Sequence, residues 1–234
     1  MTMSWRDNAK RRAAAKAVEH ISDDMIIGLG SGTTSAEAIR LIGNKIKDNK
    51  LKGIKGVPTS YQAIQEAVKA RVQLTTLDEH PILDFGFDGA DQIDSELNAI
   101  KGHGGALLRE KIVASCCKEY ILIMDETKKT RRLGINQPVY LEVHPIAVNP
   151  VLLKLEKMGA EASVRQSSNK LGPVVTDNGN NLIEAEFGPI DSPRELNRKL
   201  HSIQGVLETG LFLGYANIAY IGTRDSVEKI KRKP

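Results

Sequence analysis

Short apolar runs alternate with amphipathic stretches over the first half of the chain. The runs are rich in isoleucine, leucine and valine, as buried strands are, whereas the stretches between them repeat apolar residues on one helical face. We expect strands at 25–30, 53–58, 72–74, 83–87 and 120–125, and helices at 5–20, 35–46, 61–70 and 106–118. Strands that alternate with helices predict an α/β fold with a mostly parallel sheet and helices on both of its faces.

The pattern changes after about residue 133. We expect strands at 139–143, 161–165, 174–177, 182–185 and 205–208, and helices at 150–158 and 192–201. The turn Asn178-Gly179-Asn180 is a hairpin signal between two of these strands. The order β-α-β-β-α-β is that of a small ferredoxin-like α+β domain. A last strand at 219–222 returns to the large sheet, so the small domain 133–208 is predicted as an insertion in a larger domain formed by 1–132 and 209–234.

The composition is that of a folded globular protein, with 41% hydrophobic and 26% charged residues among 234. No apolar run approaches the ~20 residues that cross a membrane. The N-terminal stretch has the pattern of an amphipathic helix and not of a signal peptide. We therefore expect no membrane partner.

The formal net charge is +4, and part of it lies in the basic tail 229–233, which we interpret as a solvated end. Only 4% of residues are aromatic, and they do not alternate with basic residues, so no nucleic-acid partner is expected. Cys116 and Cys117 are adjacent in a predicted helix and poorly placed to bridge, which favours reduced thiols and a cytoplasmic location. The five histidines lack ligand spacing, so no metal site is expected.

A glycine-rich loop at 28–34 (Gly-Leu-Gly-Ser-Gly-Thr-Thr) leaves the first expected strand and enters a helix. Glycines let the backbone approach an anion, and a helix start offers N–H groups and positive potential. We expect Thr33 or Thr34 to cap the helix. A dinucleotide-binding fingerprint would have a glycine at position 33 and an acidic residue after the second strand, and this chain has neither. The loop is therefore predicted to bind a terminal phosphate; the alternative is a tight turn with a helix cap.

The segment 86–110 gathers carboxylates, a cation and glycines. Asp88 and Asp91 enclose a Gly-Ala pair after a strand, Lys101 opens the run Gly-His-Gly-Gly, and Glu110 lies near a helix start. These groups can move a proton beside a carbonyl and hold the resulting oxyanion. Each residue alone has an ordinary explanation, such as turn formation for the aspartates and surface exposure for Lys101, Glu110 and Lys128. Their order favours catalysis at the carboxyl ends of the strands, where α/β sheets bind ligands.

This ordered set resembles the ribose-5-phosphate isomerase family of the A type. The matching stretches are 28–34, 88–91, 101–104, 109–112, Lys128, 175–180, 210–212 and 221–223, and they extend almost end to end. The resemblance implies a Rossmann-like sheet with a ferredoxin-like insertion. It also implies the interconversion of ribose 5-phosphate and ribulose 5-phosphate in the pentose phosphate pathway without a cofactor, and a homodimer or homotetramer.

By that resemblance, Glu110 is the base that moves a proton between C2 and C1 through a cis-enediolate. Asp88 and Asp91 bind sugar hydroxyls and assist ring opening and proton exchange between O1 and O2. Lys101 and the neighbouring amides stabilise the enediolate oxygen. The remaining substrate-binding residues are Gly89, Ala90, Gly102, His103 and Gly104 for the sugar, and Ser31, Gly32, Thr33, Thr34 and Lys128, helped by Lys10, for the phosphate.

Two positions depart from the family pattern, which usually has Glu where this chain has Gln92 and Gly where it has His103. Two other function classes stay open at this point. One is a sugar-phosphate sensor of the kind that forms the effector domain of transcription regulators. The other is a related enzyme, such as an amino-sugar phosphate deaminase or a coenzyme A transferase. Conversion of ribose 5-phosphate to a ketose by the purified protein separates these classes.

Overall fold

The computed structural model describes residues 4–168 and 171–232, which divide into two units. Within the described residues, unit 1 comprises the chain up to Ala90, Arg109–Lys128 and the chain from Tyr215, and unit 2 comprises Asp91–Leu108 and Lys129–Gly214. We expected the small domain to span 133–208. Unit 2 also contains residues 91–108, 129–132 and 209–214, so a part of the predicted site segment belongs to it.

Unit 1 contains a seven-stranded sheet in the order β14-β13-β7-β4-β1-β2-β3. Its strands are β1 (Ile26–Leu29), β2 (Lys55–Pro58), β3 (Gln73–Leu74), β4 (Leu83–Asp88), β7 (Cys117–Asp125), β13 (Ile218–Gly222) and β14 (Val227–Lys231). All neighbouring strands are parallel except β13 and β14. This is the strand order of a Rossmann-like sheet, which confirms the predicted fold class. The chain reverses its direction across the sheet between β1 and β4, so their carboxyl ends form the switch point where such sheets bind ligands.

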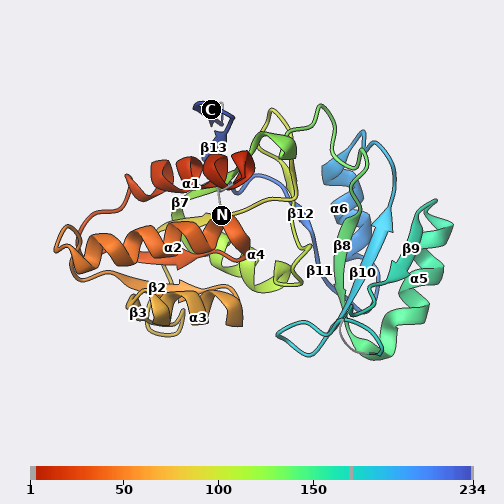
Figure 1. Cartoon of the computed structure of the whole chain (residues 1–234). Helices are drawn as coiled ribbons and strands as arrows, with labels where there is room; N and C mark the ends of the chain where they lie inside the picture. The colour runs from red at the N-terminus through yellow and green to blue at the C-terminus, as the bar shows by residue number, and fades with distance from the viewer. Residues whose placement is uncertain (1–3, 169–170, 233–234) are drawn as a thin grey trace. The chain divides into compact units, whose positions relative to one another are not determined.

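Helices cover both faces of this sheet. They are α1 (Trp5–Val18), α2 (Gly32–Lys47), α3 (Tyr61–Lys69) and α4 (Leu107–Cys116). The first three pack on the face that carries Ile27, Phe85 and Ile121, and α1 and α2 lie side by side (Figure 1). On the opposite face, Val113 of α4 packs with Val57 and Leu83. Successive residues of a strand point to opposite faces, so the two helical layers bury both faces of the central strands, while the edge strands β3 and β14 keep exposed residues.

The basic tail differs from the expectation of a solvated end. Residues 227–231 form the antiparallel edge strand β14, while Lys233 lies outside the described residues. The lysines of this strand alternate with apolar residues and charge the outer edge of the sheet, which disfavours pairing with another chain. The cysteines also differ from the predicted helical pair, because Cys116 ends α4 and Cys117 begins β7; both are free thiols.

Unit 2 contains a four-stranded antiparallel sheet in the order β11-β8-β10-β9. Its elements are β8 (Val139–Val143), the 3-10 helix η2 (Pro145–Ala147), α5 (Val148–Lys157), β9 (Glu161–Val164), β10 (Asn181–Glu186), α6 (Pro193–His201) and β11 (Val206–Thr209). This β-α-β-β-α-β order agrees with the predicted ferredoxin-like unit.

The strand expected at 174–177 is absent from the described structure. Val175 forms only an isolated bridge with Asn181, and β10 pairs with β8 on one side and with β9 on the other. The fully buried carboxylate of Glu142 explains this difference. Its Oε1 atom accepts hydrogen bonds from the side chains of Thr176 (2.8 Å), Asn178 (2.9 Å) and Asn180 (2.8 Å). The three side chains that donate to Oε1 draw the loop around the buried carboxylate and keep the segment out of a regular strand.

A second sheet in unit 2 was not expected from the sequence. Its strands are β5 (Gln92–Ile93), β6 (Ala99–Ile100) and β12 (Leu211–Phe212), in the order β12-β6-β5. Two-residue strands are too short to show a periodic pattern. This sheet matters for function because it directly precedes Lys101 and flanks the glycine run. Within the described residues, none of the helices has the length and apolar character needed to cross a membrane.

Candidate active site

The loop 30–34 lies at the switch point of unit 1, after β1 and at the start of α2. Ser31 occupies the N-cap position of α2 but makes no side-chain cap bond, so the prediction that Thr33 or Thr34 caps the helix is wrong. Instead, the Ser31 hydroxyl bonds Thr59 Oγ1 (2.8 Å) and Ser60 Oγ (2.5 Å) at the end of β2. Both threonines therefore lie within the first turn of α2, where helix N–H groups attract anions.

A cation from another helix reaches this loop. Lys10 of α1 donates from Nζ to Thr33 Oγ1 at 3.5 Å. The two residues line a cavity of about 290 Å³ together with Asp7, Ala36, Glu37, Arg40 and Gln62. The Gly32 N–H donates to Gln62 Oε1 at 2.7 Å, which fixes the entrance of the helix. The loop thus combines hydroxyl donors, a helix N-terminus and an ammonium group, the chemistry that binds a phosphate monoester.

Asp88 ends β4 and is fully buried beside the loop. Its Oδ1 atom accepts hydrogen bonds from the N–H groups of Ser31 (3.1 Å) and Gly89 (2.7 Å) and from Ser35 Oγ (3.2 Å). A buried carboxylate needs such donors to stay ionised. This contact requires Gly30, because a Cβ atom there would lie 2.5 Å from Asp88 Cγ and 2.4 Å from the Phe87 carbonyl oxygen.

Glu110 lies in the first turn of α4 and is only 6% exposed. A solvated helix face is therefore excluded as the explanation for this residue. Burial raises the pKa of the Tyr120 hydroxyl well above its ordinary value, and the negative charges of Asp88 and Glu110 raise it further. Tyr120 also donates to Asp88 Oδ2 at 3.5 Å. One buried phenol in unit 1 thus hydrogen-bonds one carboxylate and is affected by the charge of a second, a relationship that the sequence did not reveal.

Lys128 is half-buried in the short 3-10 helix η1 (Glu126–Lys128), beyond the carboxyl end of β7. This is the same edge of the sheet as the loop 30–34, because β7, β4 and β1 are adjacent parallel strands. Among the described residues, Lys128 forms no hydrogen bond to the loop 30–34. Its predicted phosphate contact stays a prediction.

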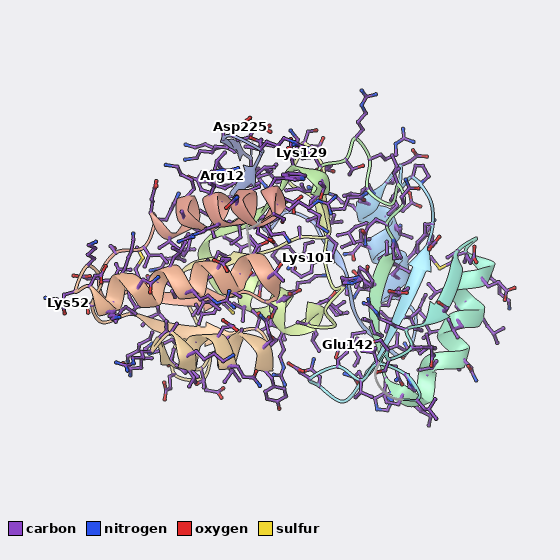
Figure 2. The ribbon with its side chains drawn as sticks, in the orientation of Figure 1. Arg12, Lys52, Lys101, Lys129, Glu142 and Asp225 are labelled. Atoms are coloured by element: carbon purple, nitrogen blue, oxygen red, sulfur yellow. The ribbon has the colours of Figure 1, made fainter. Side chains whose placement is uncertain are left out.

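Unit 2 holds the remaining predicted residues except Ala90, which belongs to unit 1. Lys101 (Figure 2) is 3% exposed, with its Nζ 5.3 Å from the centre of the Phe212 ring, so it is not the surface lysine that its type alone would suggest. Its backbone N–H donates to the Gly210 carbonyl at 2.9 Å. The turn 102–105 follows, with Gly102 at φ +112° and Gly105 at φ +77°, and the Gly105 N–H closes it by donating to the Gly102 carbonyl at 2.9 Å.

Asp91 and His103 are joined within unit 2. The His103 N–H donates to Asp91 Oδ2 at 3.0 Å, so one predicted carboxylate holds the backbone of the predicted oxyanion turn. The His103 and Gly104 residues are exposed, whereas Gly102 is buried. The turn therefore presents backbone and imidazole groups at a surface next to a buried lysine, which is suited to holding a developing negative charge.

Gln92, the other position that departs from the family pattern, has a local structural role. Its Oε1 accepts from the Gly134 N–H and its Nε2 donates to the Ile135 carbonyl, both at 2.8 Å. The side chain is buried at 8% exposure. An ionised glutamate could accept the first bond but could not donate the second. Gln92 thus fixes the segment 134–135 beside β5 through two hydrogen bonds.

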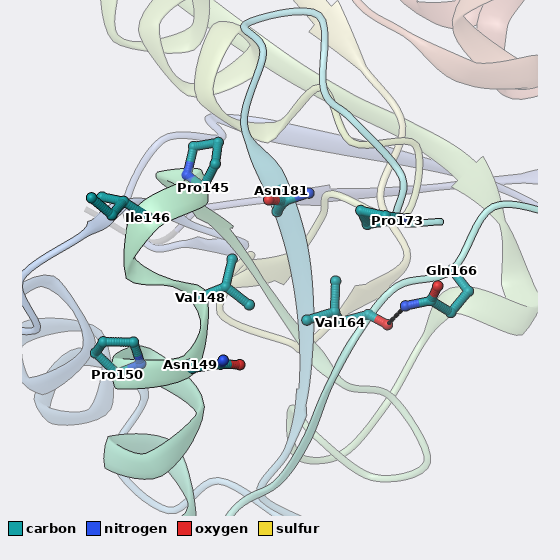
Figure 3. A pocket seen from close by; sticks show the side chains of 9 residues that line it. All are labelled: Pro145, Ile146, Val148, Asn149, Pro150, Val164, Gln166, Pro173 and Asn181. Atoms are coloured by element: carbon teal, nitrogen blue, oxygen red, sulfur yellow. Dashed lines mark hydrogen bonds between the residues drawn. The ribbon is translucent and has the colours of Figure 1, made fainter. Parts of the chain in front are cut away.

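A larger hollow in unit 2 has a different character (Figure 3). This cavity of about 460 Å³ is lined by Pro145, Ile146, Val148, Asn149, Pro150, Val164, Gln166, Pro173 and Asn181. The Gln166 Nε2 atom donates to the Val164 carbonyl at 3.1 Å. None of these lining side chains is charged, so the hollow offers no counter-charge to a sugar phosphate. The anion-binding chemistry of the chain lies elsewhere.

Comparison with known proteins gives a consistent result. Residues 55–226 match the family model described as ribose 5-phosphate isomerase A (phosphoriboisomerase A). The chain is 42% identical to "Ribose-5-phosphate isomerase A" of Trichodesmium erythraeum, with 95% of this chain and 94% of that protein aligned. It is also 42% identical to the protein of the same name from Pyrococcus abyssi, with 97% and 99% aligned.

Solved structures agree in fold. A D-ribose-5-phosphate isomerase in complex with phospho-erythronic acid has a TM-score of 0.96 and 42% identity, covering 98% of this chain and all of that one. Ribose 5-phosphate isomerase A of Methanocaldococcus jannaschii has a TM-score of 0.92 and 39% identity, covering 96% and 99%. Neither a sensor nor a deaminase or transferase is among these relatives.

Proposed function

We propose a catalytic mechanism from one premise: the chain belongs to the ribose 5-phosphate isomerase A family and interconverts ribose 5-phosphate and ribulose 5-phosphate. The reaction moves one hydrogen from C2 to C1 and another from O2 to O1 of the open-chain aldose. Oxidation at C2 balances reduction at C1 within one molecule. The protein must therefore supply a base for carbon, proton exchange between oxygens and a counter-charge for the intermediate.

Glu110 acts as the base at carbon. Its carboxylate takes the proton from C2, the C–H electron pair forms the C1–C2 double bond, and the C1 carbonyl pair moves to O1. Return of the proton from Glu110 to C1, with transfer of the O2 proton to O1, completes the ketose. The burial of Glu110 and its effect on the Tyr120 phenol support this role, because a desolvated carboxylate is a stronger base than a hydrated one.

Asp88 and Asp91 bind sugar hydroxyls, assist ring opening and exchange protons between O1 and O2, with Gly89 and Ala90 contributing backbone. Lys101 and the turn amides neutralise the enediolate oxygen. The burial of Lys101 supports this assignment, because a buried ammonium group stabilises an anion that forms during the reaction more strongly than a hydrated one does.

The phosphate binds to the loop at the switch point. The residues concerned are Ser31, Gly32, Thr33 and Thr34, with the ammonium groups of Lys10 and Lys128. The hydrogen bond between Lys10 and Thr33 supports this, because it places a cation on the first turn of α2. Anchoring the phosphate fixes the sugar carbons relative to the base, which converts binding energy into orientation.

The observation that carries the proposal is the burial of Asp88 and Glu110 in the same unit as the loop 30–34, with Asp88 accepting hydrogen bonds from the Ser31 N–H of that loop and from the Tyr120 hydroxyl. The direct test incubates the purified protein with ribose 5-phosphate and follows ketose formation by ¹H and ¹³C NMR. We expect ribulose 5-phosphate at equilibrium with the aldose. Absence of ketose, with the phosphate ester intact, would overturn the assignment.

We also propose a cytoplasmic location and a homodimer or homotetramer. The two free thiols support the first, since reducing compartments keep cysteines unbridged. Exposed apolar side chains in unit 2, such as Ile146 at 86% and Leu153 at 59% exposure, support the second. Light scattering coupled to size-exclusion chromatography measures the oligomeric state, and a monomer at working concentration contradicts it.

A further inference from the structure

The turn 102–105 lacks the regular structure that holds the loop 30–34. Positive φ angles at Gly102 and Gly105 define its path, and both require glycine. A short glycine turn has many alternative conformations in isolation. The direction of its amides therefore depends on the contacts that fix His103, the one residue of the turn that has a side chain.

Arg165 contacts His103 at both backbone and side chain. It directly follows β9 on the chain, and its Nη1 donates to the His103 carbonyl oxygen. Its Nη2 lies 3.2 Å from His103 Nδ1 and 3.1 Å from Nε2, so the guanidinium nitrogen sits over the ring and not in line with one lone pair. Glu184 of β10 lies 3.5 Å from Arg165 Nε and orients the guanidinium. Two strands of the unit 2 sheet thereby reach the turn.

Tyr140 of β8 holds the other side. Its hydroxyl is 2.9 Å from His103 Nδ1 and accepts a hydrogen bond from Gln137 Nε2 at 3.0 Å. Burial and the negative charge of Asp91 raise the pKa of Tyr140, so the hydroxyl keeps the proton with which it can donate to Nδ1. A Cβ atom added at Gly102 would lie 3.0 Å from the Tyr140 Cβ, so Tyr140 also packs against the start of the turn.

We propose that Arg165 and Tyr140 are positioning residues that aim the amides of Gly102 and Gly104, which flank His103 in the turn, at the enediolate oxygen. Arg165 acts through the His103 carbonyl and ring, whereas Tyr140 acts through the ring. The inference rests on the proposed oxyanion role of Lys101 and this turn. It also assigns a role to His103, because a glycine at that position would have no ring for Tyr140 and Arg165 to contact.

The test measures kcat and KM with ribose 5-phosphate, and the inhibition constant of phospho-erythronic acid. The carboxylate of this compound resembles the pair of oxygen atoms of an enediolate. Misplacing a catalytic group by about 1 Å costs ~10²-fold, so we expect Arg165→Met to lower kcat by about 10- to 100-fold and to weaken the inhibitor similarly, with KM nearly unchanged. Arg165→Lys keeps the charge but lacks the two-nitrogen fork, and we expect it to resemble Arg165→Met. Arg194→Met removes the same charge from an exposed position of α6 and serves as the control.

A double-mutant cycle separates the two contacts. Tyr140→Phe should lower kcat severalfold in the wild-type background and have no further effect in His103→Gly, whereas Arg165→Met should retain part of its effect there through the carbonyl. Wild-type kcat and inhibitor binding in Arg165→Met, wild-type behaviour of Arg165→Lys, or an equal effect of Tyr140→Phe in both backgrounds would overturn the proposal. Circular dichroism melting identifies a variant that loses activity by unfolding.

Lys101→Met distinguishes this inference from the mechanism on which it rests. Loss of kcat in Lys101→Met with unaffected Arg165 and Tyr140 variants rejects the positioning roles alone. Full activity of Lys101→Met rejects the oxyanion role of the whole segment.

Discussion

Two glycine-rich segments of this protein offer backbone amides to an anion, and they are built differently. The loop 30–34 in unit 1 lies between β1 and α2, and its amides are the first N–H groups of a helix. The turn 102–105 in unit 2 follows a two-residue strand and is held by side chains of Asp91, Tyr140 and Arg165. The first segment is fixed by regular elements, the second by single contacts.

This difference matches the tasks that we assign to them. A phosphate carries its charge throughout the reaction, so a helix terminus that binds it equally well at every stage is adequate. The enediolate oxygen exists only during the reaction, so its donors must point at a position that the substrate does not yet occupy. We therefore expect changes in the loop to act mainly on KM and changes at the turn or the base to act on kcat.

Replacement of the base should give the largest effect. Because general-base catalysis contributes roughly 10²- to 10⁴-fold, Glu110→Gln is expected to lower kcat by about two to four decades with KM little changed. Steady-state kinetics with ribose 5-phosphate measure both constants. Turnover close to that of the wild type would remove Glu110 from the mechanism.

Loss of the buried cation comes next. Removing one oxyanion donor costs about 10²- to 10³-fold, and Lys101→Met is expected to lower kcat to that extent while leaving KM nearly constant. Lys199→Met, which removes an exposed ammonium from α6 of the same unit, is the control. A change confined to KM would place Lys101 with the phosphate loop and erase the contrast between the two segments.

A methyl group at Gly30 is an exception within the loop, because it disturbs Asp88 as well as the phosphate site and should therefore affect both kcat and KM. In Gly30→Ala the new Cβ displaces Asp88, and overpacking of this kind costs about 1–3 kcal/mol of unfolding free energy. Denaturant unfolding and kinetics measure the two effects. Gly32→Ala meets no atom within 4 Å but has φ +88°, so it should strain the backbone by about 1–2 kcal/mol without moving Asp88. Equal kinetic effects of the two variants would contradict the role of Gly30.

Removal of a phosphate cation should act on binding. Lys128→Ala is expected to raise KM by about tenfold, equivalent to ~1.4 kcal/mol, with kcat nearly constant. The matched control is Lys52→Ala, an exposed lysine of unit 1 (Figure 2). An unchanged KM for Lys128→Ala excludes this residue from the phosphate site.

The smallest effect is expected at Tyr120. The wild type should lose stability as the pH rises above ~10, because unfolded Tyr120 ionises while the folded phenol, with its raised pKa, keeps its proton. Tyr120→Phe removes that contribution and should flatten the fall, with a loss of kcat below tenfold because Asp88 retains its donors on Oδ1. Urea unfolding between pH 7 and 11 measures the slope; identical slopes in both proteins contradict the expectation.

The same contrast governs how much the sequence could predict. The strand, loop and helix around 26–47 follow a local apolar pattern, so the loop 30–34 was placed correctly. The turn was visible as a glycine run, but its anchors were not, because Arg165 and Tyr140 are distant along the chain and neither has a motif. The hydrogen bond of Tyr120 to Asp88 likewise depends on the order of β4 and β7 in the sheet, which tertiary packing decides.

Two errors have the same origin. Threonine preference predicted a cap at Thr33 or Thr34, but the helix starts earlier, directly after Ser31, which contacts Thr59 and Ser60 just after the neighbouring strand β2. The hairpin signal at 178–180 correctly marked a turn, yet the buried charge of Glu142 recruits its side chains and prevents the expected strand. Local propensity failed where a long-range polar contact was stronger.

Hydrogen exchange into the substrate tests the central claim most directly. Ribulose 5-phosphate is incubated in D₂O with wild-type protein and with Glu110→Gln, and deuterium at C1 is followed by ¹H NMR. We predict that the wild type incorporates deuterium and forms aldose, while Glu110→Gln does neither and still binds phospho-erythronic acid. Deuterium incorporation at the wild-type rate in Glu110→Gln would show that another group removes the proton, and would contradict the account.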